Sequence, residues 1–298
     1  MSVFILKVIA CFIMLLDHIG AVLGSDGWGI INADISIYLR GIGRISYPIF
    51  AFLIVNGWRY TKNKYQYFSR MLLFSGLSQI PYTLALYTVN TMKITSDENQ
   101  FYFNSVFFEN WYIYALIFIS YLYFVWRNRK NASVISLLSA VVISSLYIKI
   151  DFMWIIISEL NVFYTLSIGI ILILFLEYIA EIKLKYWYNY IILIPTIILI
   201  LISFGSKCDY GIPGILLIVV LYIFREKKFL QAITICIWSF AFYGITYNNY
   251  YNATMAAFSV IFIILYNKKK GLNFKYSFYA FYPVHLLILG MINWLLRI

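Results

Sequence analysis

Charged residues are scarce in this sequence, where they make up 12% of 298 residues against 63% hydrophobic residues. Soluble globular domains carry about 25% charged residues, so this composition excludes an ordinary soluble enzyme or binding module. Long polar segments are also lacking. The longest polar loop covers only about 89–103, so there is no room for a separate soluble domain. We therefore expect a single integral membrane domain over residues 1–298.

Cysteine and histidine are equally sparse. Cys11, Cys208 and Cys236 are scattered without the spacing of a metal or redox motif. The two histidines, His18 and His285, do not form a metal-ligand signature, and we predict no metal. A net charge of +11 raises the question of nucleic-acid binding, but no basic face is separable from the loops between the apolar runs. The basic residues therefore indicate membrane topology.

Apolar runs fill most of the chain. A helix that crosses a bilayer needs about 20 mostly apolar residues. Runs of this kind predict an all-α fold, a polytopic transmembrane helical bundle of about eleven spans (10–11). The expected spans are 4–24, 36–58, 70–88, 104–126, 132–150, 153–179, 187–204, 211–224, 229–247, 251–266 and 277–296.

Most of the 23 Lys and Arg residues fall near the N-terminus or in alternate loops, which places them on one side of the predicted bundle. Cytoplasmic loops carry an excess of these residues, so we expect a cytoplasmic N-terminus. The residues on that side are Lys7, Arg59, Lys62, Lys64, Arg70, Arg127, Arg129, Lys130, Lys183, Lys185, Arg225, Lys227, Lys228, Lys268, Lys269, Lys270 and Lys275.

Four ionisable residues interrupt the first two spans: Asp17 and His18 in the first, Arg40 and Arg44 in the second. Such residues are costly in a membrane. Two arginines four positions apart share a helix face and repel unless Asp17 or a ligand's phosphate or carboxylate lies between them. Adjacent helix positions face different directions, so we expect Asp17 to bind arginine while His18 points elsewhere. The structural alternative is an ion pair that only holds the two spans together.

The polar residues of later spans carry two interpretations each. A neutral imidazole is the usual general base, a role that suits His18. His285, in the last span, either works in the same site or is a hydrogen-bonded packing residue. Glu159 and Asn161 lie at the start of ELNVFYTL, and Asp209 and Tyr210 lie in CDYG before the next apolar run. Each pair caps a helix N-terminus or lines a site.

A basic cluster follows the second span. We interpret it first as a topology signal and also predict that it binds the phosphates of a cytoplasmic donor. Its members are Arg59, Lys62, Lys64 and Arg70.

Several segments together resemble the TraX family of bacterial membrane proteins. The specific elements are DHIG within 6–23, GR-x-x-x-P-x-F-A-F within 39–82 and FYP-x-H-L within 266–289. The resemblance continues through LNVFYTLSIGIILIL and DYGIPGILLIVVLYIFR, whereas residues 89–158 match nothing that we recognise.

This resemblance implies a membrane acetyltransferase. The family's best-known activity is N-acetylation of the amino terminus of conjugative pilin, but many members occur where no such pilin is expected. A looser similarity links the chain to membrane acyltransferases that modify cell-surface glycans. Those proteins carry a basic residue and a histidine separated by ten residues in the first helix, as Lys7 and His18 are here, with Lys in place of the more usual Arg.

We therefore expect a multi-pass protein of the bacterial cytoplasmic (inner) membrane that transfers an acyl group, acetyl from acetyl-CoA, to an amine or hydroxyl of a cell-envelope acceptor. That acceptor is a pilin-like protein or a surface glycan. His18 is the expected general base, and Arg40 or Arg44 the expected oxyanion stabiliser. Asp17 holds one arginine, and His285 lines the same cavity. The alternatives are a transporter or flippase of a lipid-linked or small anionic substrate, and a structural component without chemistry.

Overall fold

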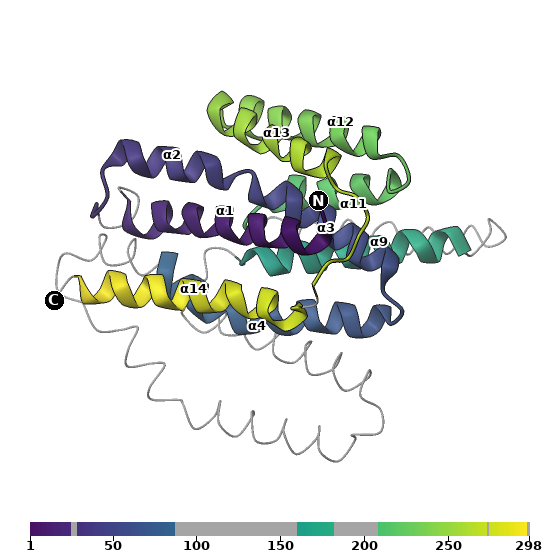
Figure 1. The fold of residues 1–298 in the computed structure, drawn as a ribbon, viewed down its shortest axis with the longest axis horizontal. Coiled ribbons are helices and arrows are strands. Elements are labelled where there is room, and N and C mark those ends of the chain that lie inside the picture. The colour runs from purple at the N-terminus through teal and green to yellow at the C-terminus, as the bar shows by residue number, and fades with distance from the viewer. Residues whose placement is uncertain (25–28, 87–159, 182–207, 273, 297–298) are drawn as a thin grey trace, which may run out of the picture.

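The computed structural model describes residues 1–24, 29–86, 160–181, 208–272 and 274–296. Within these ranges the chain is helical and forms no strand, apart from an isolated bridge between Leu160 and Cys208. The predicted all-α fold is thus confirmed for the described part (Figure 1). Its helices are α1 (Val3–Leu23), α2 (Ala33–Gly43), α3 (Ser46–Tyr60), α4 (Lys64–Leu86), α9 (Val162–Glu181), α11 (Gly211–Ile223), α12 (Lys228–Ser239), the π-helix η4 (Phe240–Thr246), α13 (Tyr250–Ile264) and α14 (Lys275–Leu295).

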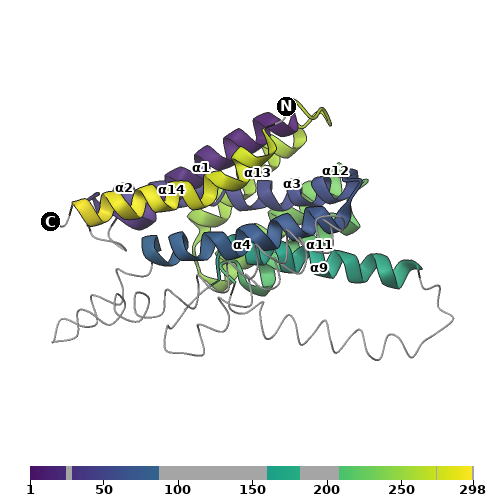
Figure 2. The same cartoon turned by 90° about the horizontal axis from the view of Figure 1, so that it is seen from below.

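Helix α1 has a central position in the bundle, where it packs against α2, α3 and α14. Helix α4 lies between α14 and α9, and α11 lies against α9 and α3 (Figures 1 and 2). The core between these helices is rich in aromatic side chains, and its largest fully buried members are Trp58, Tyr47, Tyr282 and Phe52. The N-terminal and C-terminal helices are therefore neighbours, although almost the whole chain separates them.

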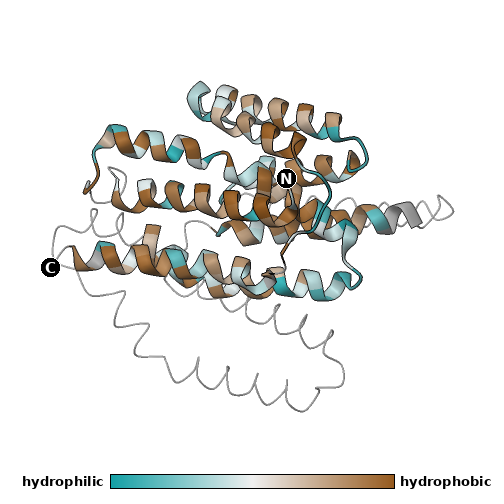
Figure 3. Cartoon of the chain, viewed as in Figure 1, coloured by the Kyte–Doolittle hydropathy of each residue, from teal (hydrophilic) through white to brown (hydrophobic). Residues whose placement is uncertain are grey.

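Large apolar side chains also cover the outside of the bundle. Phe229, Ile237 and Ile245 are 76%, 65% and 79% exposed, and Figure 3 shows apolar residues along all the helices, with polar residues interspersed on α2 and α4. Burying such surface is the main favourable term in folding in water, so leaving it exposed there would be costly. Helices that are apolar all round suit a lipid environment.

Three helical segments in the described part are long and apolar enough to cross a membrane: Val3–Leu23, Ala33–Tyr60 and Lys228–Thr246. This number is far below the predicted eleven. The expected runs 104–126, 132–150 and 187–204 lie outside the described residues, as do all of 89–158 and the start of 153–179. Part of the remaining shortfall has a physical cause, because α11 and α13 contain only 13 and 15 residues, fewer than the roughly 20 that a bilayer-spanning helix needs.

The second predicted span, 36–58, is interrupted. Helix α2 ends at Gly43, a turn follows at Arg44 and Ile45, and α3 begins at Ser46. Pro48 has no N–H to donate to the carbonyl of Arg44, so the regular hydrogen-bond ladder cannot continue through this point. The interruption leaves Arg44 at the end of α2, where its side chain can reach α1.

Within the described residues, several basic segments of the predicted cytoplasmic side lie together at one end of the bundle. The N–H of Val3 donates to the carbonyl of Lys269 at 2.9 Å, and Lys228 Nζ donates to the carbonyl of Tyr266 at 2.7 Å. Arg59 forms an ion pair with Glu226 at 2.7 Å. These contacts confirm that the N-terminus and the segments near 59, 226 and 268 are neighbours. That this end faces the cytoplasm stays a prediction.

Candidate functional site

Asp17 lies between the two arginines of the interrupted span. Its Oδ1 is 3.4 Å from Arg40 Nη1, and its Oδ2 is 3.8 Å from Arg44 Nη1. The carboxylate is buried, with a side chain 8% exposed, and the arginine side chains are 31% and 15% exposed. The structure therefore confirms the predicted pairing of Asp17 with both arginines.

Glycines permit this approach of α1 to α2. A Cβ atom on Gly43 would lie 2.2 Å from the Cβ of Asp17, a distance that non-bonded carbons do not reach. Gly20 lies against Leu39 in the same interface, where the Ser36 hydroxyl donates to the carbonyl of Gly20 at 2.9 Å. The absence of side chains at these positions lets Asp17 reach the arginines.

His18, the next residue of α1, contacts a different helix. Its Nδ1 lies 2.6 Å from Nε2 of His285 on α14, and both side chains are buried. His285 Nδ1 lies 2.7 Å from the carbonyl oxygen of Phe281, one helical turn earlier. The rings of His18 and His285 stack at 4.9 Å, and Tyr282 meets both edge-on. The two histidines of the sequence thus form one buried pair.

The proton positions in this pair follow from its partners. A carbonyl oxygen only accepts hydrogen bonds, so Nδ1 of His285 carries a proton and donates it to Phe281. Nε2 of a neutral His285 is then an acceptor, and Nδ1 of His18 must be the donor. In a neutral His18 the remaining nitrogen, Nε2, carries an unprotonated lone pair. The arrangement therefore presents His18 Nε2 as a proton acceptor.

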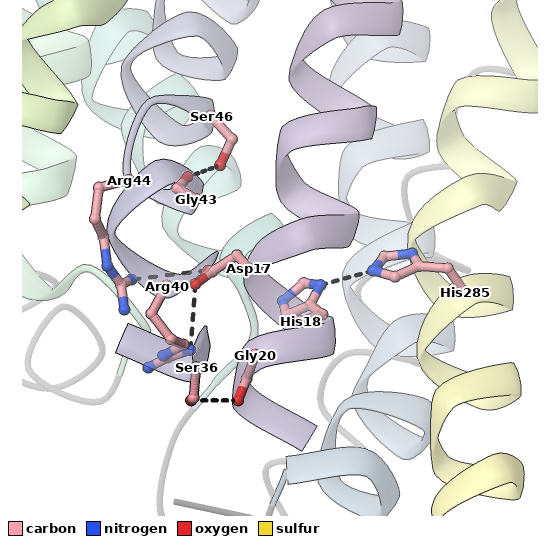
Figure 4. Close-up of polar contacts among 9 residues, drawn as sticks. All are labelled: Asp17, His18, Gly20, Ser36, Arg40, Gly43, Arg44, Ser46 and His285. Atoms are coloured by element: carbon pink, nitrogen blue, oxygen red, sulfur yellow. Dashed lines mark hydrogen bonds and ion pairs between the residues drawn. The ribbon is translucent and has the colours of Figure 1, made fainter. Parts of the chain in front are cut away.

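Asp17 and His18 point to different sides of α1, as expected from helix geometry (Figure 4). The carboxylate faces α2, and the imidazole faces α14. A pocket of about 400 Å³ is lined by both arginines but by neither histidine, so His285 does not line the arginine cavity. The other residues that line this pocket are Asp209, Tyr210, Phe242, Tyr243, Tyr247, Asn249 and Asn252.

The predicted phosphate-binding cluster is partly occupied by carboxylates of the protein. Arg59 pairs with Glu226, and Lys64 Nζ lies 2.7 Å from Glu177 Oε2. Lys62 is exposed, and the Arg70 guanidinium lies 6.0 Å from the centre of the Tyr67 ring. Arg59, Lys64 and Arg70 therefore contact three different residues, and the described structure shows no common binding point for the cluster.

Glu177 is a charged residue with several side-chain partners that the sequence patterns did not single out. It accepts hydrogen bonds from Trp58 Nε1 at 3.1 Å and from the Tyr222 hydroxyl at 2.7 Å, besides pairing with Lys64. An acidic residue within the apolar run LILFLEYIA was the available signal. Its partners give Glu177 a packing role among α3, α9 and α11.

The structure gives Asn161 and Asp209 different roles, whereas Glu159 lies outside the described residues. Asn161 is buried and caps α9, because its Oδ1 accepts from the N–H of Phe163 at 3.0 Å. Its Nδ2 donates to the carbonyl of Ser75 and to Gln79 Oε1, both at 2.8 Å. Asp209 instead lines the arginine pocket. In the described residues, His, Cys, Asp and Glu side chains form no group of three or more that could hold a metal ion.

Comparison with known proteins supports one family. The family model described as "TraX protein" matches residues 2–97 and 112–293. A curated relative, "Probable fimbrial assembly protein FimC, serogroup H1" from Dichelobacter nodosus, is 36% identical over 78 residues. That match spans 26% of this chain and 30% of the relative. No solved structure matches the chain.

Proposed function

Because this chain belongs to the TraX family, we propose that it transfers an acetyl group from acetyl-CoA to an amine or hydroxyl of a cell-envelope acceptor at the bacterial cytoplasmic membrane. A relative named as a fimbrial assembly protein favours an acceptor of pilin type, with a surface glycan as the second choice. The buried histidine pair is the single observation that carries this proposal.

His18 Nε2 is the general base of the proposed reaction. It takes the proton from the acceptor nitrogen or oxygen while that atom bonds to the thioester carbonyl carbon of acetyl-CoA. The carbon–sulfur bond then breaks, and the proton passes to the departing CoA sulfur. Positioned bases of this kind contribute about 10²–10⁴-fold to a rate.

His285 acts through His18. Its Nε2 accepts the hydrogen bond of His18 Nδ1, which fixes the tautomer and ring orientation of the base. The carbonyl of Phe281 fixes His285 in turn. This chain of a base, an orienting group and a further acceptor follows the logic of a catalytic triad.

The oxyanion role expected for Arg40 and Arg44 finds less support. Both side chains lie on the face of α1 opposite the histidine pair (Figure 4). Donor phosphates are assigned to the basic end of the bundle, where Lys62 is exposed. Arg59 and Lys64 would have to exchange Glu226 and Glu177 for such phosphates, which weakens their part in the proposed donor site.

The test is acetyl transfer by the full-length protein in lipid vesicles. Radiolabelled acetyl-CoA is supplied with envelope material from cells that lack the gene. We expect label in the envelope material with the wild-type protein and a loss of about 10²-fold or more with His18→Ala. Size-exclusion profiles of both proteins in detergent serve as the folding control.

Full transfer by folded His18→Ala would refute the base assignment. Absence of transfer by the wild-type protein would instead favour the alternative, transport of a lipid-linked or small anionic substrate, which rests on the arginine-lined pocket. Fluorescent lipid-linked anions in the same vesicles would then report movement between leaflets without any acetyl transfer.

A further inference from the structure

We infer that the pocket lined by Arg40 and Arg44 is a binding site for the phosphate or carboxylate group of a ligand that enters from the end of the bundle opposite the basic segments. The inference rests on the pocket alone and is independent of acetyl transfer. The arginines lie on the other side of α1 from the histidine pair, so this site is separate from the proposed base (Figure 4).

The arginines have binding capacity that Asp17 does not use. Each guanidinium carries five N–H groups, and each makes one contact with Asp17, at 3.4 and 3.8 Å. Nε of Arg44 is buried and has no hydrogen-bond partner among the described residues. A buried donor without a partner is unfavourable, and a bound anion would supply the missing acceptor.

The remaining walls supply neutral hydrogen-bonding groups. Tyr243, on η4, lies with its ring centre 5.9 Å from the Arg44 guanidinium. Asn249 caps α13 by accepting from the N–H of Asn252 at 2.9 Å, which fixes this wall. π-helical segments occur frequently at functional sites, and η4 places Tyr243 in this one.

Short helices explain how two arginines are tolerated within an apolar span. Helix α13, with 15 residues, is about 22 Å long, against about 30 Å for the hydrocarbon core of a bilayer. It meets α2 at Tyr38 and Gly41 through Tyr251, so the first turn of α2 extends beyond it (Figures 1 and 2). Ionisable residues in membrane proteins commonly face such a water-filled recess.

Asp209 is the acidic residue among those that line this pocket, and it offers a control of opposite charge to the arginines. Its charge opposes anion binding, whereas the charges of Arg40 and Arg44 favour it. Opposite substitutions should therefore change the anion preference in opposite directions. This prediction supplies matched variants within a single pocket.

The test measures charge selectivity at one cysteine. Asn252→Cys is introduced after Cys11→Ala, Cys208→Ala and Cys236→Ala, and the full chain is placed in vesicles. A sulfonate thiosulfonate and a trimethylammonium thiosulfonate are compared, each normalised to a free thiol. We expect the anionic reagent to react about tenfold faster, which corresponds to a free-energy difference of about 1.4 kcal/mol between the two reagents.

Three variants test the source of that preference. Arg44→Gln should reduce the ratio at least threefold, and Asp209→Asn should increase it. Lys270→Gln, exposed at the opposite end, should leave the ratio unchanged. Tyr247→Cys provides a second reporter, exposed in the same wall, if the first variant does not fold.

Inorganic phosphate and acetate, added separately at millimolar concentration, complete the experiment. Slower labelling with one of them supports the site and identifies phosphate or carboxylate as the preferred group. The inference is overturned by a ratio no larger than that of the free thiol, by labelling that Arg44→Gln does not alter, or by failure of both anions to protect.

Discussion

His18 Nδ1 donates a hydrogen bond of 2.6 Å to His285 Nε2 across the interface between the first and last helices. The two residues are 267 positions apart, and both side chains are buried. This contact couples the arrangement of α1 and α14 to the protonation state of His18.

Replacing His285 tests its positioning role. His285→Leu should reduce acetyl transfer by about 10²-fold, the lower range for a lost acid–base contribution, because His18 loses its orienting acceptor. His285→Gln should restore part of the activity, since Gln offers an amide oxygen to His18 Nδ1. Initial rates of transfer in vesicles measure both variants. Equal activities of folded His285→Leu and His285→Gln would show that the hydrogen-bond acceptor for His18 Nδ1 is unimportant.

Removing the carboxylate of Asp17 should destabilise the fold. Asp17→Asn leaves Arg40 and Arg44 without their shared counter-ion, and breaking a buried pair costs about 3–5 kcal/mol. Unfolding in detergent, followed by circular dichroism, measures the loss. Arg59→Gln breaks an exposed pair and should cost about 1 kcal/mol or less. A similar small loss in Asp17→Asn would contradict the described burial.

Adding a methyl group at Gly43 should push α1 away from α2. The new Cβ would meet Asp17 Cβ at 2.2 Å, and overpacking of this kind costs about 1–3 kcal/mol. Gly290→Ala is the matched control, because its nearest neighbour, Ala85, lies at an ordinary 3.6 Å. Thermal unfolding of the two variants side by side provides the comparison. Equal stability of both would show that the α1–α2 contact is looser than described.

Asn161 offers a prediction away from the site. Asn161→Ala removes the α9 cap and leaves Gln79 Oε1 and the carbonyl of Ser75 with fewer donors. A lost cap and an unmade buried hydrogen bond each cost about 1 kcal/mol or more. We expect a lower unfolding midpoint with acetyl transfer retained at temperatures well below it. Loss of activity without loss of stability would assign Asn161 to the site.

Local patterns predicted a large part of this site. The pairing of Asp17 with the arginines followed from the four-residue spacing of Arg40 and Arg44 and from the need to neutralise them in an apolar span. The separation of Asp17 from His18 followed from helix periodicity. The carboxylate partners of Arg59 and Lys64 in the predicted donor cluster could not be predicted from local patterns, because they are more than 100 residues away in the sequence.

The sequence by itself determined the class of the protein. Composition and apolar runs predicted helices with lipid-compatible surfaces, and charge spacing predicted that the basic segments would share one end. Only the tertiary structure decided that His285 is the partner of His18, that Pro48 accompanies a break after α2, and that the arginines face a pocket closed by η4 and α13. The physical reason is that periodicity fixes the direction of a side chain within its own helix, whereas the neighbouring helix is chosen by packing across the whole chain.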